Sequence, residues 1–100
     1  MKISVIIDCI NRKDGVIYEL GFKLTVILAT DDFSGEFDLG DKTIFPKSKL
    51  IELIDSLTNS GNEVDIKTIE GTKVYIVDNR YFRTDGDNND KNDLLDLPAC

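Results

Sequence analysis

Carboxylates are the side chains with the most chemistry to offer in this chain, and four of them lie close together in the sequence. Acid–base catalysis by paired carboxylates needs two groups held at fixed spacing in a dry pocket, with pKa values driven apart. The segment that carries them is interrupted by glycine and offers neither a fixed spacing nor a pocket. It predicts a solvated acidic loop or a partner-binding acidic surface, built from Asp31, Asp32, Glu36 and Asp38.

Other catalytic and metal-binding patterns are missing or incomplete. The chain has no histidine, so the commonest general base, the usual metal ligand and every Ser-His or Cys-His pair are absent. Asp85, Asp87, Asn89 and Asp96 fall at EF-hand ligand spacing, but Asp90 replaces the required glycine and Asp96 replaces a bidentate glutamate. No glycine-rich phosphate loop is present. We therefore expect a protein that is not an enzyme and that uses no cofactor and no metal.

The two cysteines form no recognisable disulfide framework or C-x-x-C motif. Cys9 lies in the first apolar run, and Cys100 is the last residue of the sequence. We expect Cys9 to be a small buried hydrophobe and Cys100 to be a free thiol on a mobile end. Two free thiols predict a reducing compartment, namely the cytoplasm of a bacterial or infected host cell, or a particle assembled there.

The negative charge is concentrated in two segments. The 100-residue chain carries a net charge of −7, enough length for one domain. Residues 31–41 contribute −5 without any Lys or Arg, and residues 85–100 contribute −4, so the remaining residues sum to +2. This pattern predicts a near-neutral domain over residues 1–84 and an acidic, low-complexity, flexible tail over residues 85–100. No apolar run reaches membrane-spanning length and no signal peptide is evident, so we expect no membrane association.

Alternation of apolar and polar residues predicts two strands at the start of the chain, over residues 3–10 and 16–29. Asp14 and Gly15 between them suit a tight hairpin turn. The second strand is longer than usual, and Gly21 marks the expected place for a bend or bulge. Unbroken alternation assigns one face of this strand to the core, namely Val16, Tyr18, Leu20, Phe22, Leu24, Val26 and Leu28.

The rest of the domain reads as a short third strand or small hairpin within residues 36–45, one helix, and a second hairpin. Pro46 ends the strand region, Ser48 is the expected helix N-cap, and apolar residues then recur at helical spacing. Residues 64–69 and 73–80 alternate as two strands around a turn at Gly71. We expect the long strand to pack against one stripe of the helix, formed by Leu50, Leu53, Ile54 and Leu57.

The fold predicted from this order is α+β, with a small antiparallel sheet of four to five strands (β-β-(β)-α-β-β) and one amphipathic helix packed on it. A small OB-like barrel is the alternative, because it shares the strand order and an early long, bent strand. The domain is short for that barrel, which favours the open sheet.

The function predicted is that of a non-enzymatic, small acidic protein that binds a basic protein partner. Acidic groups on a rigid sheet can imitate nucleic-acid phosphates, so the partner class includes a nucleic-acid-binding enzyme. Inhibitors, immunity-type proteins and assembly components of phages or mobile elements have this character. The expected partner-binding residues are the acidic segment and an apolar cluster near the end of the chain, which together comprise Asp31, Asp32, Glu36, Asp38, Asp41, Leu94, Leu95 and Leu97.

Two other functions fit the sequence. The first is an OB-like protein that binds single-stranded nucleic acid, for which stacking aromatics and a basic groove are required. The residues that would supply them lie around the last strand, namely Lys73, Tyr75, Arg80, Tyr81, Phe82 and Arg83. The second is a structural component of a larger particle.

Overall fold

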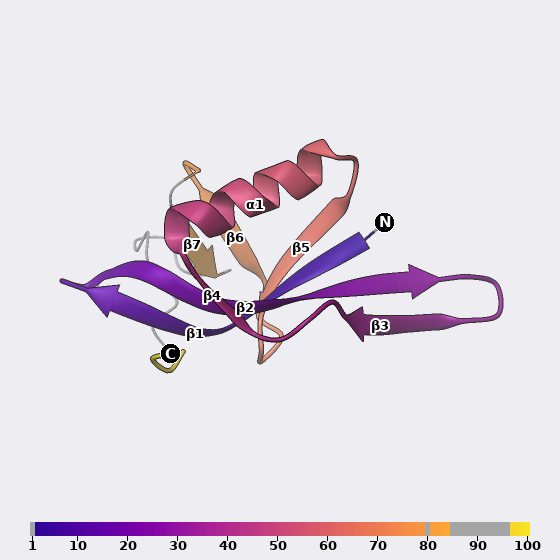
Figure 1. The fold of residues 1–100 in the computed structure, drawn as a ribbon, viewed down its shortest axis with the longest axis horizontal. Helices are drawn as coiled ribbons and strands as arrows, with labels where there is room; N and C mark the ends of the chain where they lie inside the picture. Colours follow the sequence, from indigo (N-terminus) through magenta and orange to yellow (C-terminus); the bar gives the residue numbers. More distant parts are fainter. Residues whose placement is uncertain (1, 80, 85–96) are drawn as a thin grey trace.

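The computed structural model of the chain describes residues 2–79, 81–84 and 97–100. It is a mixed α+β fold with one five-stranded sheet, a separate two-stranded sheet and one helix that crosses the larger sheet (Figure 1). The elements are β1 (Lys2–Lys13), β2 (Val16–Ala29), β3 (Ser34–Asp38), β4 (Thr43–Pro46), α1 (Lys47–Asn59), β5 (Glu63–Thr68), β6 (Val74–Val77) and β7 (Tyr81–Thr84). The predicted fold class is confirmed. Within the described residues the larger sheet stays open, so the alternative of a closed barrel is wrong.

The larger sheet is built around the long β1–β2 hairpin. Its strand order is β3-β2-β1-β5, and β4 also pairs with β2. The turn adopts positive φ values at Asp14 (54°) and Gly15 (79°), as the sequence predicts for a tight hairpin. β5 returns parallel to β1, from Lys2 opposite Glu63 to Ile7 opposite Thr68, so the sheet is mixed.

The predicted second hairpin has different partners in the structure. The predicted hairpin is reduced to a single bridge between Lys67 of β5 and Lys73, the residue before β6, and β5 forms an edge of the large sheet instead. β6 pairs antiparallel with β7. The predicted strand over residues 73–80 ends early because Asp78 and Asn79 take left-handed conformations, with φ values of 54° and 56°, which these two residue types tolerate.

The two strands that follow β2 in the chain, β3 and β4, both pair with β2. β3 lies beside Thr25–Ala29, and β4 lies beside Glu19–Phe22, on the same edge of β2. The short third strand is therefore confirmed, whereas a small hairpin within residues 36–45 is wrong. β2 is long enough to pair with two short strands in succession, and this leaves β3 on the distal half of β2.

The helix begins directly after Pro46, which occupies the N-cap position without a side-chain hydrogen bond. The expected Ser48 cap is wrong, because Ser48 already lies in the first helical turn. Leu50, Ile51 and Ile54 are buried against the sheet, and Leu53 packs beside them as a partly buried residue. The face of the sheet that α1 covers is called the core face below, and the opposite face is called the outer face.

Two bulges interrupt the β1–β2 hairpin, one in β1 and one in β2, and the second decides which side chains at the start of β2 reach the core. The register skips Asp8 between the pairs Ile7–Phe22 and Cys9–Gly21, and it skips Tyr18 further along. Each extra residue reverses the alternation that follows it. The predicted core face is therefore correct for Leu20, Phe22 and Val26, which are buried. It is wrong for Val16 and Tyr18, which are exposed at the bulge, whereas Leu28 keeps the predicted face but is exposed because it lies beyond α1.

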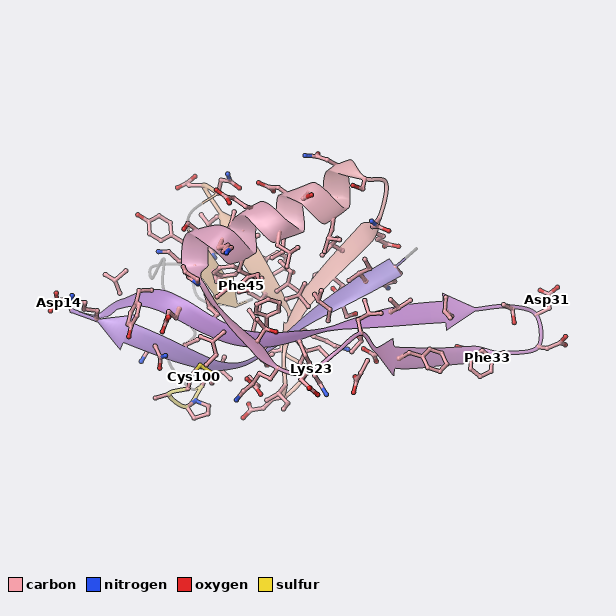
Figure 2. The ribbon with its side chains drawn as sticks, in the orientation of Figure 1. Asp14, Lys23, Asp31, Phe33, Phe45 and Cys100 are labelled. Atoms are coloured by element: carbon pink, nitrogen blue, oxygen red, sulfur yellow. A yellow bond between two sulfur atoms is a disulfide. The ribbon has the colours of Figure 1, made fainter. Side chains whose placement is uncertain are left out.

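The end of the chain is attached to the start of the sheet by a disulfide bond. Cys9 and Cys100 are bonded, with Cα atoms 5.0 Å apart. The Ile10 N–H donates to the Pro98 carbonyl at 2.9 Å, and the Cys100 N–H donates to Asn11 Oδ1 at 3.0 Å. Cys100 lies on the outer face, on the side of the sheet away from α1 (Figure 2). The expectation of two free thiols is wrong, because folding brings the two ends of the chain together.

Gly21 makes room for this disulfide. A Cβ atom at position 21 would overlap Cys9 Sγ, and it would lie 3.1 Å from Cys100 Sγ, a tight contact. The glycine was predicted to mark a bend. The pairing of β1 with β2 does shift opposite Gly21, but the residue that bulges out of the pairing is Asp8 of β1. Its further role is to let the sulfur atoms lie flat against the backbone of β2.

Replacing Gly21 with alanine should therefore destabilise the oxidised protein by about 1–3 kcal/mol, the usual cost of overpacking a filled site. Denaturant unfolding of the wild type and of the Gly21→Ala variant measures this cost. The matched control is the same substitution in a Cys9→Ala background, where the obstructing sulfur is absent and most of the penalty should disappear. An equal penalty in both backgrounds would contradict the role assigned to Gly21.

Candidate partner-binding surface

The acidic segment forms part of a two-stranded arm that projects from the domain. The arm is defined here as residues 24–41, which comprise the distal half of β2, the turn, β3 and the loop that leads to β4. β1 reaches only as far as Ile27 of β2, so the end of the arm has neither β1 nor α1 beside it (Figure 1). The molecule is accordingly elongated, with extents of 48 × 25 × 25 Å.

One face of the arm is apolar and exposed. It continues the core face beyond the end of α1, and it carries Leu28, Phe33, Phe37 and Leu39, which are 43–54% exposed. The rings of Phe33 and Phe37 stack with centroids 5.6 Å apart. Both rings lie over Gly35, where a Cβ atom would be 3.2 Å from Phe33 Cζ and 3.5 Å from Phe37 Cε2. Gly35 thus leaves space for the ring pair to lie close to the strand.

This apolar face continues into a pocket at the base of the arm. The pocket has a volume of about 220 Å³, and its apolar walls come from β2, β4, α1 and the loop after β3. Lys23 and Asp41 supply charged groups to the pocket lining. A pocket beside exposed aromatic rings is the arrangement in which one apolar side chain of a partner can be anchored. The apolar lining residues are Phe22, Leu24, Leu39, Phe45 and Leu53.

The opposite face of the arm carries part of the predicted acidic surface, and lysines from β2 and β5 reach it. Glu36 accepts a hydrogen bond from Thr25 Oγ1, and its Oε1 lies 3.7 Å from Lys67 Nζ. Asp38 Oδ2 lies 3.3 Å from Lys23 Nζ. The segment lacks cations in sequence, but the sheet places two of them beside it. These pairs are exposed, so each contributes less than about 1 kcal/mol and can be exchanged for a partner's charge.

The other acidic residues of the segment lie in the turns. Asp31 is at the tip of the arm (Figure 2). Asp31, Asp32 and Asp41 are exposed and have no salt bridge to any residue in the described part of the chain. The five acidic residues are therefore distributed over the tip, the outer face and the base of the arm, and do not form one flat array.

The predicted apolar cluster near the end of the chain is only partly within the described residues. Leu94 and Leu95 lie outside them, as does the EF-hand-like run from Asp85 to Asp96. Leu97 is described, and it is 8% exposed within the hydrophobic core of its own chain. The hydrogen bond at Pro98 and the disulfide hold the segment so that this side chain packs inward, and a role of Leu97 in partner binding stays a prediction.

The residues proposed for nucleic-acid stacking are divided by the β6–β7 hairpin. Phe82 is fully buried in the core, which removes it from any stacking surface. Tyr75 is exposed, lies opposite Arg83, and has Lys73 Nζ 5.4 Å from its ring centroid. Arg80 lies outside the described residues. A small cationic and aromatic patch therefore remains around Tyr75, with one stacking ring fewer than the sequence suggested.

No family model, no curated protein and no solved structure matches this chain. Over the described residues, no helix is both long enough and apolar enough to cross a membrane. The same part of the chain contains no group of three or more Cys, Asp or Glu side chains placed to hold a metal ion.

Two features of the site were missed by sequence reasoning. The first is that the acidic segment shares its strands with an exposed aromatic pair, Phe33 and Phe37. A glycine midway between two phenylalanines was the available signal. The second is the attachment of Cys100 to β1. Gly21 inside a long strand was the signal for a close approach, and its partner across the sequence was not visible.

Proposed function

We propose that this chain is a non-enzymatic protein-binding module that engages a basic protein partner through the arm. The observation that carries the proposal is one projecting hairpin that combines the exposed, stacked Phe33–Phe37 pair with Asp31 and Asp32, which are exposed and form no salt bridge with another described residue. Exposed aromatics supply contact area, and surrounding charge steers the encounter and selects the partner. Inhibitors, immunity-type proteins and assembly components of phages or mobile elements act in this way.

The arrangement favours insertion of the arm over imitation of a nucleic acid. A nucleic-acid mimic presents acidic groups as a regular row, whereas here Glu36 and Asp38 already contact lysines and the acidic residues occupy several sides of the arm. An arm with an apolar face and an acidic tip instead fits a basic-rimmed apolar cleft. A nucleic-acid-binding enzyme remains one partner of this class.

The compartment is part of the proposal. A cytoplasmic location was expected because both thiols were expected to be free. The Cys9–Cys100 bond removes that reason, and it supports an oxidising compartment, where disulfides persist. Rapid alkylation of protein taken from its native cells, followed by mass spectrometry of the two cysteines, tests this directly.

Capture of the partner from native cells tests the proposed function. Asp31→Asn together with Asp32→Asn should reduce recovery of the partner by at least about threefold, because two steering charges are lost. The matched control is Asp14→Asn together with Asp55→Asn, which removes two exposed carboxylates away from the arm and should leave recovery unchanged. Binding should also weaken as salt rises from 0.1 to 1 M, where the Debye length falls from about 10 Å to about 3 Å.

The rival function predicts the opposite dependence. Titration of labelled single-stranded DNA would then show tight binding that is lost on Lys73→Ala and Arg83→Ala and strengthened by removal of acidic charge near the end of the chain. That charge is best removed by changing the five aspartates of residues 85–96 to asparagine. Deletion of residues 85–100 is less suitable, because it would also remove Cys100 and with it the disulfide bond to Cys9. Tight DNA binding with this dependence would overturn the proposed function.

A further inference from the structure

The outer edge of β3 has backbone groups that point away from the sheet. The Leu39 N–H donates to the Leu24 carbonyl at 2.8 Å, and the Thr30 N–H donates to the Phe33 carbonyl at 2.6 Å. Hydrogen-bonded and non-hydrogen-bonded pairs alternate in an antiparallel ladder. The register therefore turns the N–H and C=O groups of Phe37 toward β2, and it turns those of every second residue outward, namely Ser34, Glu36 and Asp38.

None of the described strands pairs with this edge, because β3 ends the order of the large sheet. An exposed edge is a template for a further strand, and proteins restrict it by shortness and by charge. β3 has both restrictions, with five residues and two carboxylates. Charge excludes some strands and admits others, so it determines which partner the edge can accept.

We propose that β3 accepts an extended segment of a basic partner as an additional strand, in which apolar and basic residues alternate. This inference rests on the proposed function and names the form of the partner. Side chains of an added strand alternate between the faces of the sheet. Those on one face would lie beside the Phe33–Phe37 pair and favour apolar residues, and those on the other would lie beside Glu36 and Asp38 and favour Lys or Arg.

The lysines near the outer face do not cancel this preference. An added strand would have Glu36 and Asp38 as its direct cross-strand neighbours, at about 5 Å between Cβ atoms. Lys23 and Lys67 reach these two carboxylates from the strands behind β3, with Nζ 3.3 Å from Asp38 Oδ2 and 3.7 Å from Glu36 Oε1. Such solvent-accessible pairs are weak, so a basic side chain on the added strand can share or replace either lysine.

The same charges disfavour a second copy of this chain on the edge. Pairing β3 with itself about a two-fold axis at its centre would place Glu36 opposite Glu36, and like charges directly opposite each other destabilise a sheet. A basic segment meets no such repulsion. Charge complementarity therefore selects the peptide over the dimer.

A synthetic peptide of about seven residues that alternates Lys and Val matches the length of β3. Added to the full, oxidised protein, it should slow hydrogen exchange at the Ser34, Glu36 and Asp38 amides by at least about tenfold at saturation. Two-dimensional NMR detects this protection residue by residue. A peptide with Glu in place of Lys should give no protection, and neither should the Lys–Val peptide N-methylated at every amide, which keeps its charge but cannot pair.

Charge reversal on the protein provides the complementary test. Glu36→Lys with Asp38→Lys should reverse the preference, so that the Glu–Val peptide now protects the edge and the Lys–Val peptide does not. Circular dichroism and denaturant melts establish that this variant is folded, and Asp38→Asn alone is the milder second variant, expected to weaken the Lys–Val peptide at least about threefold.

Three results would overturn the inference. The first is equal binding of the N-methylated peptide. The second is protection of the same amides without peptide, accompanied by a dimer in sedimentation. The third is absence of any protection by the Lys–Val peptide. If partner capture still depends on Asp31 and Asp32 in that last case, strand addition is wrong while the proposed function stands.

Discussion

Reduction of the Cys9–Cys100 bond should lower the free energy of unfolding by about 4 kcal/mol. The two cysteines are separated by 91 positions, and a cross-link that closes so long a loop removes much of the entropy of the unfolded chain. Domains of this size are stable by only about 5–15 kcal/mol, so the loss would be a large fraction of the total. Denaturant unfolding with and without a thiol reductant measures the difference.

The control is the Cys9→Ala, Cys100→Ala double variant, whose stability should match that of the reduced wild type and should not respond to reductant. The contacts near the end of the chain should also loosen on reduction, because Leu97 and the Pro98 carbonyl lose their covalent anchor. Exchange of the Ile10 amide, which donates to Pro98, reports this locally. A difference below about 1 kcal/mol between oxidised and reduced protein would contradict the cross-link as a main source of stability.

Local periodicity was sufficient to predict β1, β2, β5, the helix and the turn at Asp14 and Gly15, because each depends on neighbouring residues, but β7 was not predicted. Pairing depends on distant residues, and there the predictions were less complete. β5 and β6 read as a hairpin around Gly71, yet β5 lies parallel to β1 and forms one edge of the large sheet. The positive φ values at Asp78 and Asn79 then let β6 fold back on β7.

In the candidate site, too, the features that depend on neighbouring residues were predicted and those that depend on distant residues were not. The sequence identified the acidic residues of the arm and their lack of local cations. It did not show that β5 carries Lys67 across the sheet toward Glu36, nor that Cys100 returns to Cys9 and draws Leu97 into the core. These are long-range consequences of topology. They change an expected acidic patch into an arm with an apolar face and an expected free tail into an anchored end.

The prediction that most directly tests the register of β2 concerns two adjacent residues. Ile17→Ala should cost about 2–5 kcal/mol, because Ile17 is 1% exposed in the core and its truncation leaves a cavity. Tyr18→Ala should cost under about 1 kcal/mol, because Tyr18 is 47% exposed at the bulge. Unbroken alternation along the strand would assign the larger cost to Tyr18.

The pair discriminates well because both substitutions lie in one strand, at the same distance from the ends of the chain, and both are to alanine. Ile17→Val provides a graded check, with an expected cost of about 1 kcal/mol for one methylene group. Since the core face of β2 returns to its predicted phase at Leu20, Leu20→Ala should also be costly. The bulge at Tyr18 is therefore a local reversal between two regions of normal alternation. If Tyr18→Ala proved more damaging than Ile17→Ala, the bulge would be misplaced, and Val16 and Tyr18 would belong to the core after all.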